Sequence, residues 1–311
     1  MRLGISTPGR EPDMSIKISE PAFNDMNDEQ FKLWAALLAE RTGMEMPVQR
    51  KSYLVTSLGL RMQEISCANY DDYFQVLNSG VAGEVEWKYL IDRLTVHETR
   101  FFRHPASLKL VDEFVKAKAV DPVTGSVTVH AWSAACSTGE EAYTLAITID
   151  GALKTLKYNS YFGVMATDIS LPSIKVGRKG VYSEWRLEKY VIPELLGKYF
   201  ELKSSGQYQV KEALRRRVCF SPMNVLDLKP KAIGGMDIIV CQNLLIYFDR
   251  EKRFEIINAM ADMLNPGGLM ILGSGEIVGW VRPDIKKVDY PDTLVYQRLQ
   301  STDKSRHKVK V

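Results

Sequence analysis

Apolar residues recur at helical spacing through the first hundred residues of the chain. Two runs place them on one helix face each: Phe31, Trp34, Leu37 and Leu38, then Tyr53, Leu54, Leu58 and Met62. Asn27 or Asp28 can cap the first helix, and Gly43 can end it. Because no strand pattern interrupts these runs, residues 21–100 predict an all-α N-terminal domain. The preceding residues, 1–20, are expected to form a flexible arm.

From Pro105 onward, short β-branched runs alternate with helical stretches. The predicted strands cover residues 126–132, 160–168, 236–243 and 268–274. Such alternation is typical of a doubly wound, Rossmann-like α/β fold, which binds ligands at the carboxyl ends of its strands. This pattern predicts an α/β domain over residues 101–300, followed by a basic tail over residues 301–311.

One segment departs from the alternation. Between about residues 193 and 221, two β-like pieces flank the turn Ser204-Ser205-Gly206. Strand patterns on both sides of a short turn are typical of a β-hairpin. The sequence therefore predicts a small antiparallel β-subdomain inserted into the α/β domain.

Composition and charge exclude several classes of protein. With 45% hydrophobic and 25% charged residues, the chain has a globular balance. Its 41 basic and 38 acidic residues leave a net charge of +3, too weak to indicate a nucleic-acid partner. The four cysteines form no CxxC pair, so neither a disulfide framework nor a zinc site is indicated. No stretch reaches the ~18 apolar residues of a membrane span. We expect a cytoplasmic protein without membrane insertion.

The turn after the first predicted strand indicates a cofactor site. Its small residues, Ser133, Ala134, Ala135, Ser137 and Gly139, let a ligand approach the backbone at the start of the next helix. Neither a GxGxxG nor a GxxxxGK[ST] motif is present, and Glu140 and Glu141 would repel a pyrophosphate. The ligand is therefore expected to lack phosphates.

Asp168 ends the second predicted strand, at the same edge of the sheet. A carboxylate there can accept both hydroxyls of a ribose, or it can cap the following helix. Position alone favours neither role. A ribose acid beside a small-residue turn without a phosphate loop points to S-adenosylmethionine, whose ribose, amino group and sulfonium suit an acidic crevice.

Six segments in a characteristic order resemble the chemotaxis receptor glutamate O-methyltransferase family, from about Phe31 to Leu299. They are TVHETRFFRH (95–104), WSAACSTGEEAY (132–143), ATDIS (166–170), SPMNVLD (221–227), CQNLLIYFD (241–249) and LNPGGLMILGSGE (264–276). The resemblance implies methyl ester formation on glutamates of methyl-accepting receptors. It also implies S-adenosylmethionine as cofactor, S-adenosylhomocysteine as product and no metal.

The resemblance also implies a set of cofactor-binding residues. Two of them depart from the family pattern: His97 replaces an Asn and Gln242 replaces an Arg. The full implied set is His97, Thr99, Arg103, Glu141, Asp168, Asn224, Val225, Gln242 and Asn243.

Methylation of a carboxylate needs no strong base, because the carboxylate is already ionised near pH 7. The rate enhancement then depends mainly on positioning the carboxylate against the methyl group. We expect Arg103 to hold the incoming carboxylate in a bidentate pair. Tyr247 is expected to orient the carboxylate or the sulfonium through its hydroxyl and ring.

Basic residues Arg50, Lys51 and Arg61 lie on one helical run of the N-terminal domain. They resemble the family's basic helix, which faces the acidic cytoplasmic helices of receptors, although a run of charges can also be an ordinary solvated face. We expect a monomer that docks receptors through these residues. Two alternatives stay open: a non-catalytic S-adenosylmethionine-binding adaptor of a chemosensory complex, and a methyltransferase acting on a small carboxylic acid.

Overall fold

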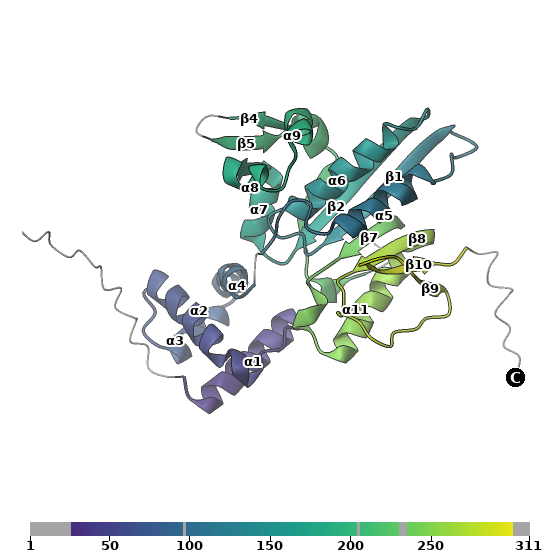
Figure 1. Cartoon of the computed structure of the whole chain (residues 1–311). Helices are drawn as coiled ribbons and strands as arrows, with labels where there is room; N and C mark the ends of the chain where they lie inside the picture. The colour runs from purple at the N-terminus through teal and green to yellow at the C-terminus, as the bar shows by residue number, and fades with distance from the viewer. Residues whose placement is uncertain (1–25, 96–97, 204–205, 230–234, 301–311) are drawn as a thin grey trace, which may run out of the picture.

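The chain forms a helical domain followed by a larger α/β domain (Figure 1). The computed structural model describes residues 26–95, 98–203, 206–229 and 235–300. The predictions for the N-terminal arm, for His97 and for the basic tail lie outside these residues. No described helix has the length and apolar character needed to cross a membrane.

The predicted all-α domain is confirmed. Its helices are α1 (Asp28–Thr42), α2 (Lys51–Glu64), α3 (Tyr70–Leu77) and α4 (Val81–Leu94). Asn27 caps α1 in a capping box with Gln30, and Gly43 ends it with a φ of 72°. The apolar faces meet in one core that contains the fully buried Trp34, Leu38, Leu54, Leu58 and Leu90.

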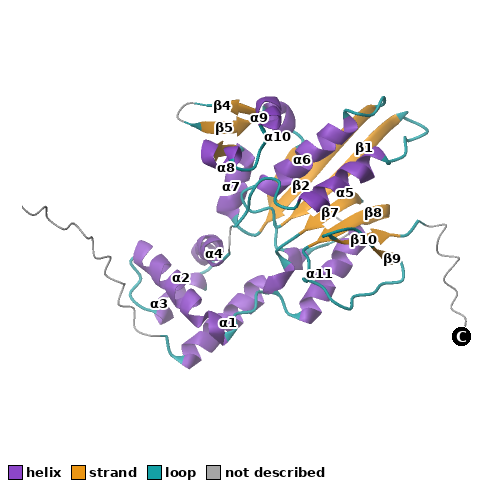
Figure 2. Cartoon of the chain, in the orientation of Figure 1, coloured by secondary structure: helices purple, strands orange, loops and turns teal. Residues whose placement is uncertain are grey.

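A seven-stranded sheet forms the centre of the α/β domain (Figure 2). Its strand order is β6-β2-β1-β7-β8-β10-β9. The strands are β1 (Ser126–Ala134), β2 (Asn159–Asp168), β6 (Val218–Pro222), β7 (Met236–Cys241), β8 (Leu264–Leu272), β9 (Ile285–Val288) and β10 (Leu294–Arg298). β1 pairs in parallel with β2 on one side and with β7 on the other. The chain order changes direction at β1, which is where such sheets bind ligands.

Helices cover both faces of this sheet. One core contains side chains of α5 (Pro105–Lys116), α6 (Glu140–Leu153) and α7 (Leu171–Lys179), and the other contains side chains of α11 (Arg250–Met263). Alternate residues of β7 enter opposite cores: Ile238 and Val240 enter the first, Ile239 and Cys241 the second. Burial on both faces explains why this strand is apolar from Ile238 to Cys241.

The inserted subdomain contains a three-stranded antiparallel sheet of order β3-β5-β4. It is built from β3 (Val181–Ser183), α8 (Glu184–Glu188), α9 (Pro193–Tyr199), β4 (Phe200–Leu202), β5 (Gln207–Val210) and α10 (Glu212–Arg215). The predicted hairpin is β4–β5, but the boundaries 193–221 need correction. The small sheet already begins at Val181, and the end of the predicted segment is β6, which pairs with β2 at the edge of the main sheet.

Candidate functional site

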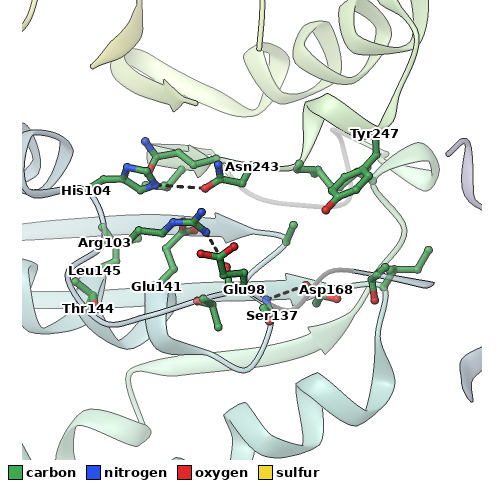
Figure 3. Close-up of a pocket in the computed structure, with 18 of the residues that line it drawn as sticks. Glu98, Arg103, His104, Ser137, Glu141, Thr144, Leu145, Asp168, Asn243 and Tyr247 are labelled. Atoms are coloured by element: carbon green, nitrogen blue, oxygen red, sulfur yellow. Dashed lines mark hydrogen bonds between the residues drawn. The ribbon is translucent and has the colours of Figure 1, made fainter. Parts of the chain in front are cut away.

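A pocket opens at the carboxyl ends of β1, β2 and β7 (Figure 3). The helical domain contributes to its wall through Thr42 at the end of α1, Met44 after it and Thr95 after α4. The segment 98–104, which leads into α5, supplies another wall. The pocket therefore lies between the two domains, at the place that the strand order of the sheet favours for a ligand.

The Asp168 carboxylate connects the turn after β1 to the loop after β2 at the pocket. Its Oδ2 accepts a hydrogen bond from the Ser137 amide at 2.8 Å, and its Oδ1 accepts one from the Ser170 amide at 2.9 Å. The N-cap of α7 is Ser170, whose side chain accepts from the Ser173 amide. The helix-capping role that the sequence left open for Asp168 is therefore taken by Ser170, and the Asp168 carboxylate lies at the pocket instead.

The turn after β1 has an unusual backbone. Ala135, Ser137 and Gly139 have φ values of 58°, 49° and 99°. Non-glycine residues in this region cost free energy and persist where surrounding contacts hold them. Ser137 also lines this pocket, and its buried Oγ has no hydrogen-bond partner among the described residues. An orphaned hydroxyl in a pocket wall fits a polar ligand that would complete its hydrogen bonding.

Glu141, in the first turn of α6, is a second acid of the pocket. Its Oε1 accepts a hydrogen bond of 2.6 Å from the Ser133 hydroxyl. Burial raises the pKa of Glu141 to about 8, although the Ser133 hydrogen bond and the charge of Arg103 act to lower it. A cationic ligand beside this carboxyl group would favour its ionised form.

Stability is expected to depend on pH through Glu141. The folded-state pKa of about 8 lies above the ordinary value of 4.5 for a glutamate, so the folded state binds more protons between these values and its stability falls as pH rises. The variant Glu141→Gln should therefore match the wild type near pH 4.5 and exceed it by more than about 1 kcal/mol at pH 8.5. Urea unfolding of the cofactor-free protein at both pH values measures this. An unfolding free energy that changes with pH by the same amount in the wild type and in Glu141→Gln would contradict this prediction.

Arg103 lies in the middle of the pocket view, close to Glu141 (Figure 3). Its Nη1 donates to the Glu98 backbone carbonyl at 2.7 Å. Across the pocket, the Asn243 side chain lies 3.3 Å from His104 Nε2, and the Asn243 backbone has a φ of 63°. The guanidinium is thus anchored through one nitrogen, which leaves its other donors to bind a carboxylate.

Tyr247 lines the opposite side of the pocket from Asp168 (Figure 3). Its ring is half-buried, and burial is the main cause that raises the pKa of its hydroxyl, so this hydroxyl stays protonated at neutral pH. The Arg50 guanidinium of the helical domain lies 5.9 Å from the Tyr247 ring centre and 5.0 Å from that of Tyr53. Arg50 is therefore the basic residue that connects the helical domain to the pocket.

The remaining predicted cofactor residues also reach this pocket. Thr99, Asn224, Val225 and Gln242 all line it. The Asn224 side chain donates to the Arg41 carbonyl at 3.2 Å, so it joins the pocket to the end of α1. The buried Gln242 donates to the Ser107 hydroxyl at 3.2 Å. Of the predicted cofactor-binding set, only His97 lies outside the described residues.

Sequence reasoning missed several lining residues: Met44, Glu98, Arg100, His104, Ser107 and Thr144. His104 and Arg100 lie within the segment TVHETRFFRH, and membership of that segment was their only signal in the sequence. Thr144 follows Glu141 by one helical turn of α6, and this spacing could have identified it. No group of His, Cys, Asp and Glu side chains suited to a metal ion occurs among the residues that the structure describes.

The structure does not favour Arg61 as a docking residue. Its Nε and Nη2 both donate to the Glu86 carboxylate at 2.7 Å, and Glu86 also accepts from the Tyr73 hydroxyl at 2.7 Å. The side chains of Arg61 and Glu86 are only 15% and 10% exposed. Lys51 pairs with the exposed Asp28 at 2.7 Å, a contact that water or a partner can replace.

The Glu86 cluster predicts a stability effect confined to the helical domain. Replacing Glu86 with Ala removes the buried partner of Arg61, which keeps only its 2.9 Å ion pair with the exposed Glu64, and should cost about 3 kcal/mol of unfolding free energy. Glu84→Ala is the matched control, since its ion pair with Arg41 is exposed and should contribute less than about 1 kcal/mol. Chemical denaturation compares the two variants. Equal losses would show that the buried cluster does not stabilise the domain.

Two protein-family models match the chain and together cover nearly all of the described residues. The model described as "CheR methyltransferase, all-alpha domain" matches residues 29–95, and "CheR methyltransferase, SAM binding domain" matches residues 97–292. The chain belongs to the CheR methyltransferase family. The helical domain is thus the all-alpha domain of a CheR protein, and most of the pocket wall belongs to its S-adenosylmethionine-binding domain.

Curated CheR relatives align over most of this chain. Chemotaxis protein methyltransferase 1 of Pseudomonas aeruginosa is 30% identical over 86% of this chain and 97% of its own length. The chemotaxis protein methyltransferase of Vibrio parahaemolyticus is 29% identical over 88% of this chain and 98% of its own length. The Escherichia coli protein of the same name is 28% identical over 81% of this chain and 85% of its own length.

Proposed function

We propose that this CheR protein transfers a methyl group from S-adenosylmethionine to glutamate carboxylates of methyl-accepting receptors. The observation that carries the proposal is the charge pattern of one pocket. Asp168 and Glu141 supply acids where a cationic, ribose-bearing cofactor would lie, and Arg103 supplies the cation that an incoming carboxylate needs. Both partners of the reaction thus find a complementary charge within a single pocket.

The cofactor would be held by the small-residue turn and by the two acids. The Asp168 carboxylate would accept ribose hydroxyls, as acids at this position do in other sheets of this type. Ser137 Oγ supplies the unused hydrogen-bonding group beside it. Glu141 would face the ammonium group, whose charge stabilises the carboxylate form of a residue with a raised pKa.

The reaction needs orientation more than acid–base chemistry. Bound S-adenosylmethionine supplies a methyl group whose bond to sulfur breaks as its carbon bonds to the glutamate oxygen, leaving S-adenosylhomocysteine and a neutral ester. The free donors of Arg103 would hold the carboxylate in line with that methyl group. The Tyr247 hydroxyl, protonated at neutral pH, would donate to the second carboxylate oxygen.

The expected substrate is a receptor helix, because the relatives are chemotaxis methyltransferases. Cytoplasmic helices of such receptors would place the protein in the cytoplasm. Arg50 is the docking residue that the geometry favours most, since it lies beside Tyr247 at the pocket. Lys51 adds a second cation on the same domain once its exposed pair with Asp28 opens.

The deciding experiment measures transfer of labelled methyl groups from S-adenosylmethionine to purified cytoplasmic fragments of candidate receptors. The expected product is protein-bound label that mild base releases as methanol, which identifies a carboxyl ester. Receptor fragments whose candidate glutamates are replaced by alanine provide the control. Cofactor binding without transfer to any receptor would instead favour an adaptor or another substrate.

Reversing the charge of Arg50 tests the docking surface. Arg50→Glu should raise the KM for the receptor about tenfold at low salt, and the effect should shrink as salt screens the charges. Lys88→Glu on α4 is the control, because Lys88 is exposed in the same domain and lies outside the pocket wall. Steady-state methylation at two salt concentrations measures both variants. A receptor KM that Arg50→Glu leaves unchanged would refute docking through this residue.

A further inference from the structure

The inserted β-subdomain contacts the cofactor turn directly. The Tyr182 hydroxyl, on β3, donates to the backbone carbonyl of Thr138 at 2.8 Å. Arg186, on α8, donates from Nη1 to Glu140 Oε1 at 2.7 Å, and Glu140 Oε2 accepts from the Thr138 hydroxyl at 2.6 Å. Two side chains of the subdomain therefore hold the same residue of the turn, one through its backbone and one through Glu140.

Burial makes these contacts costly to lose. Tyr182 is 3% exposed and Glu140 is 1% exposed. A buried carboxylate without its cation, or a buried carbonyl without its donor, is penalised by its lost hydration. Glu140 lies in the first turn of α6, where the helix N-terminus favours its negative charge, and the ion pair with Arg186, whose side chain is 43% exposed, adds a counter-charge.

The packing around Tyr182 leaves the turn little freedom. A Cβ added at Gly139 would lie 2.9 Å from the Tyr182 hydroxyl and 2.9 Å from Phe220. The Tyr182 ring also packs edge-on against Phe101, with 5.0 Å between the ring centres. Phe101 packs in the same way against Phe200 of β4, with 5.6 Å between the ring centres. Through Phe101, the subdomain supports the segment that carries Arg103 as well.

The other side of the turn is held by the main sheet. The Cys136 amide donates to the Thr167 carbonyl at 2.9 Å, and the Ser137 amide donates to Asp168. The left-handed Ala135 and Ser137 therefore lie between anchors from the sheet and anchors from the subdomain. A strained conformation of this kind needs support on both sides.

We propose that Tyr182 and Arg186 are positioning residues that fix the turn at residues 135–139 in its cofactor-binding conformation. This inference rests on the proposed cofactor site. The subdomain thereby determines cofactor affinity from outside the pocket, since neither side chain lines the pocket wall. Removing either anchor lets the turn relax, and binding must then restore its conformation before the cofactor contacts can form.

Calorimetric titration of the full chain with S-adenosylhomocysteine tests the proposal. Tyr182→Phe retains the ring contacts and loses only the hydroxyl, and Arg186→Gln removes the counter-charge of Glu140. Each variant should bind about tenfold more weakly than the wild type, as expected for the loss of one buried hydrogen bond or of the cation that pairs with one buried carboxylate. In methylation assays the KM for S-adenosylmethionine should rise by a similar factor while kcat stays within about twofold.

Two further variants separate positioning from general destabilisation. Arg216→Gln breaks an exposed ion pair with Glu212 beyond β5 and should leave binding unchanged. Adding Glu140→Gln to Arg186→Gln removes the unpaired buried charge but not the missing anchor, so stability should recover while affinity stays about tenfold below that of the wild type. Hydrogen exchange at the Ser137 amide should quicken in Tyr182→Phe, because its turn opens more often.

The outcomes distinguish this inference from the proposed function. A wild-type chain that does not bind S-adenosylhomocysteine contradicts the proposed cofactor site itself. Wild-type binding that is matched by Tyr182→Phe and Arg186→Gln overturns the positioning role alone. Unchanged exchange at Ser137 in Tyr182→Phe also overturns it, even if that variant unfolds at a lower temperature.

Discussion

Replacing Arg103 with alanine is expected to lower the rate of methyl transfer by about 100- to 1,000-fold, the usual effect of removing one oriented donor from a reacting charge. Among the described residues Arg103 donates only to the Glu98 carbonyl, through one nitrogen, so we expect its remaining donors to bind an incoming carboxylate. The loss should appear in kcat at saturating cofactor and receptor. Single-turnover transfer of labelled methyl groups measures it.

Arg103→Lys provides the informative comparison. Lysine retains the charge but lacks the planar fork of donors, so it should recover only a small part of the activity. Calorimetry with S-adenosylhomocysteine should show that both variants still bind the product. Full methyl transfer by Arg103→Ala would remove this residue from the mechanism.

Asp168→Asn should weaken binding of S-adenosylhomocysteine by about 100-fold, because charged acceptors make hydrogen bonds worth about 1.5–3 kcal/mol. The carboxylate accepts from the Ser137 and Ser170 amides, which an asparagine oxygen can satisfy only one at a time. Its proposed bonds to the ribose would weaken in addition. Titration calorimetry of the folded variant gives the affinity.

Asp227→Asn is the control for Asp168→Asn. Asp227 lies in the short turn after Asn224 and is not part of the pocket wall, so its substitution should leave affinity unchanged. Thermal unfolding of both variants separates lost binding from lost structure. An affinity of Asp168→Asn within about threefold of the wild type would contradict the proposed ribose contact.

The strands that sequence predicted well are the ones that are buried on both faces. The runs around Ile238 and Ile271 are continuous and apolar because each face of these strands meets a core. The edge strands gave no such signal. β9 carries two exposed lysines, and β6 is a five-residue strand beside three arginines, so its residues were assigned to the neighbouring hairpin. Edge position removes the hydrophobic pattern on which prediction depends.

The site could be predicted wherever a motif places a residue at the end of a strand. Asp168 ends β2, Asn224 and Asn243 follow β6 and β7, and parallel strands bring their carboxyl ends to one edge. Arg61 shows the limit of this reasoning. Its pairing with Glu86 joins two helices, and periodicity cannot reveal which side chain a cation meets across a helix interface. Tyr182 and Arg186 were missed for the same reason.

The pairing of β1 has a consequence for how the chain folds. β1 is central, yet its second neighbour, β7, is about a hundred residues further along the sequence. Contacts of such long sequence separation form late, because closing a long loop costs entropy before any pairing compensates it. During synthesis the helical domain can fold from its own local contacts. One edge of β1 stays unpaired until the ribosome has synthesised β7. Slow translation just after β7 would therefore favour correct folding, and the unpaired edge of β1 is where we expect a chaperone to bind.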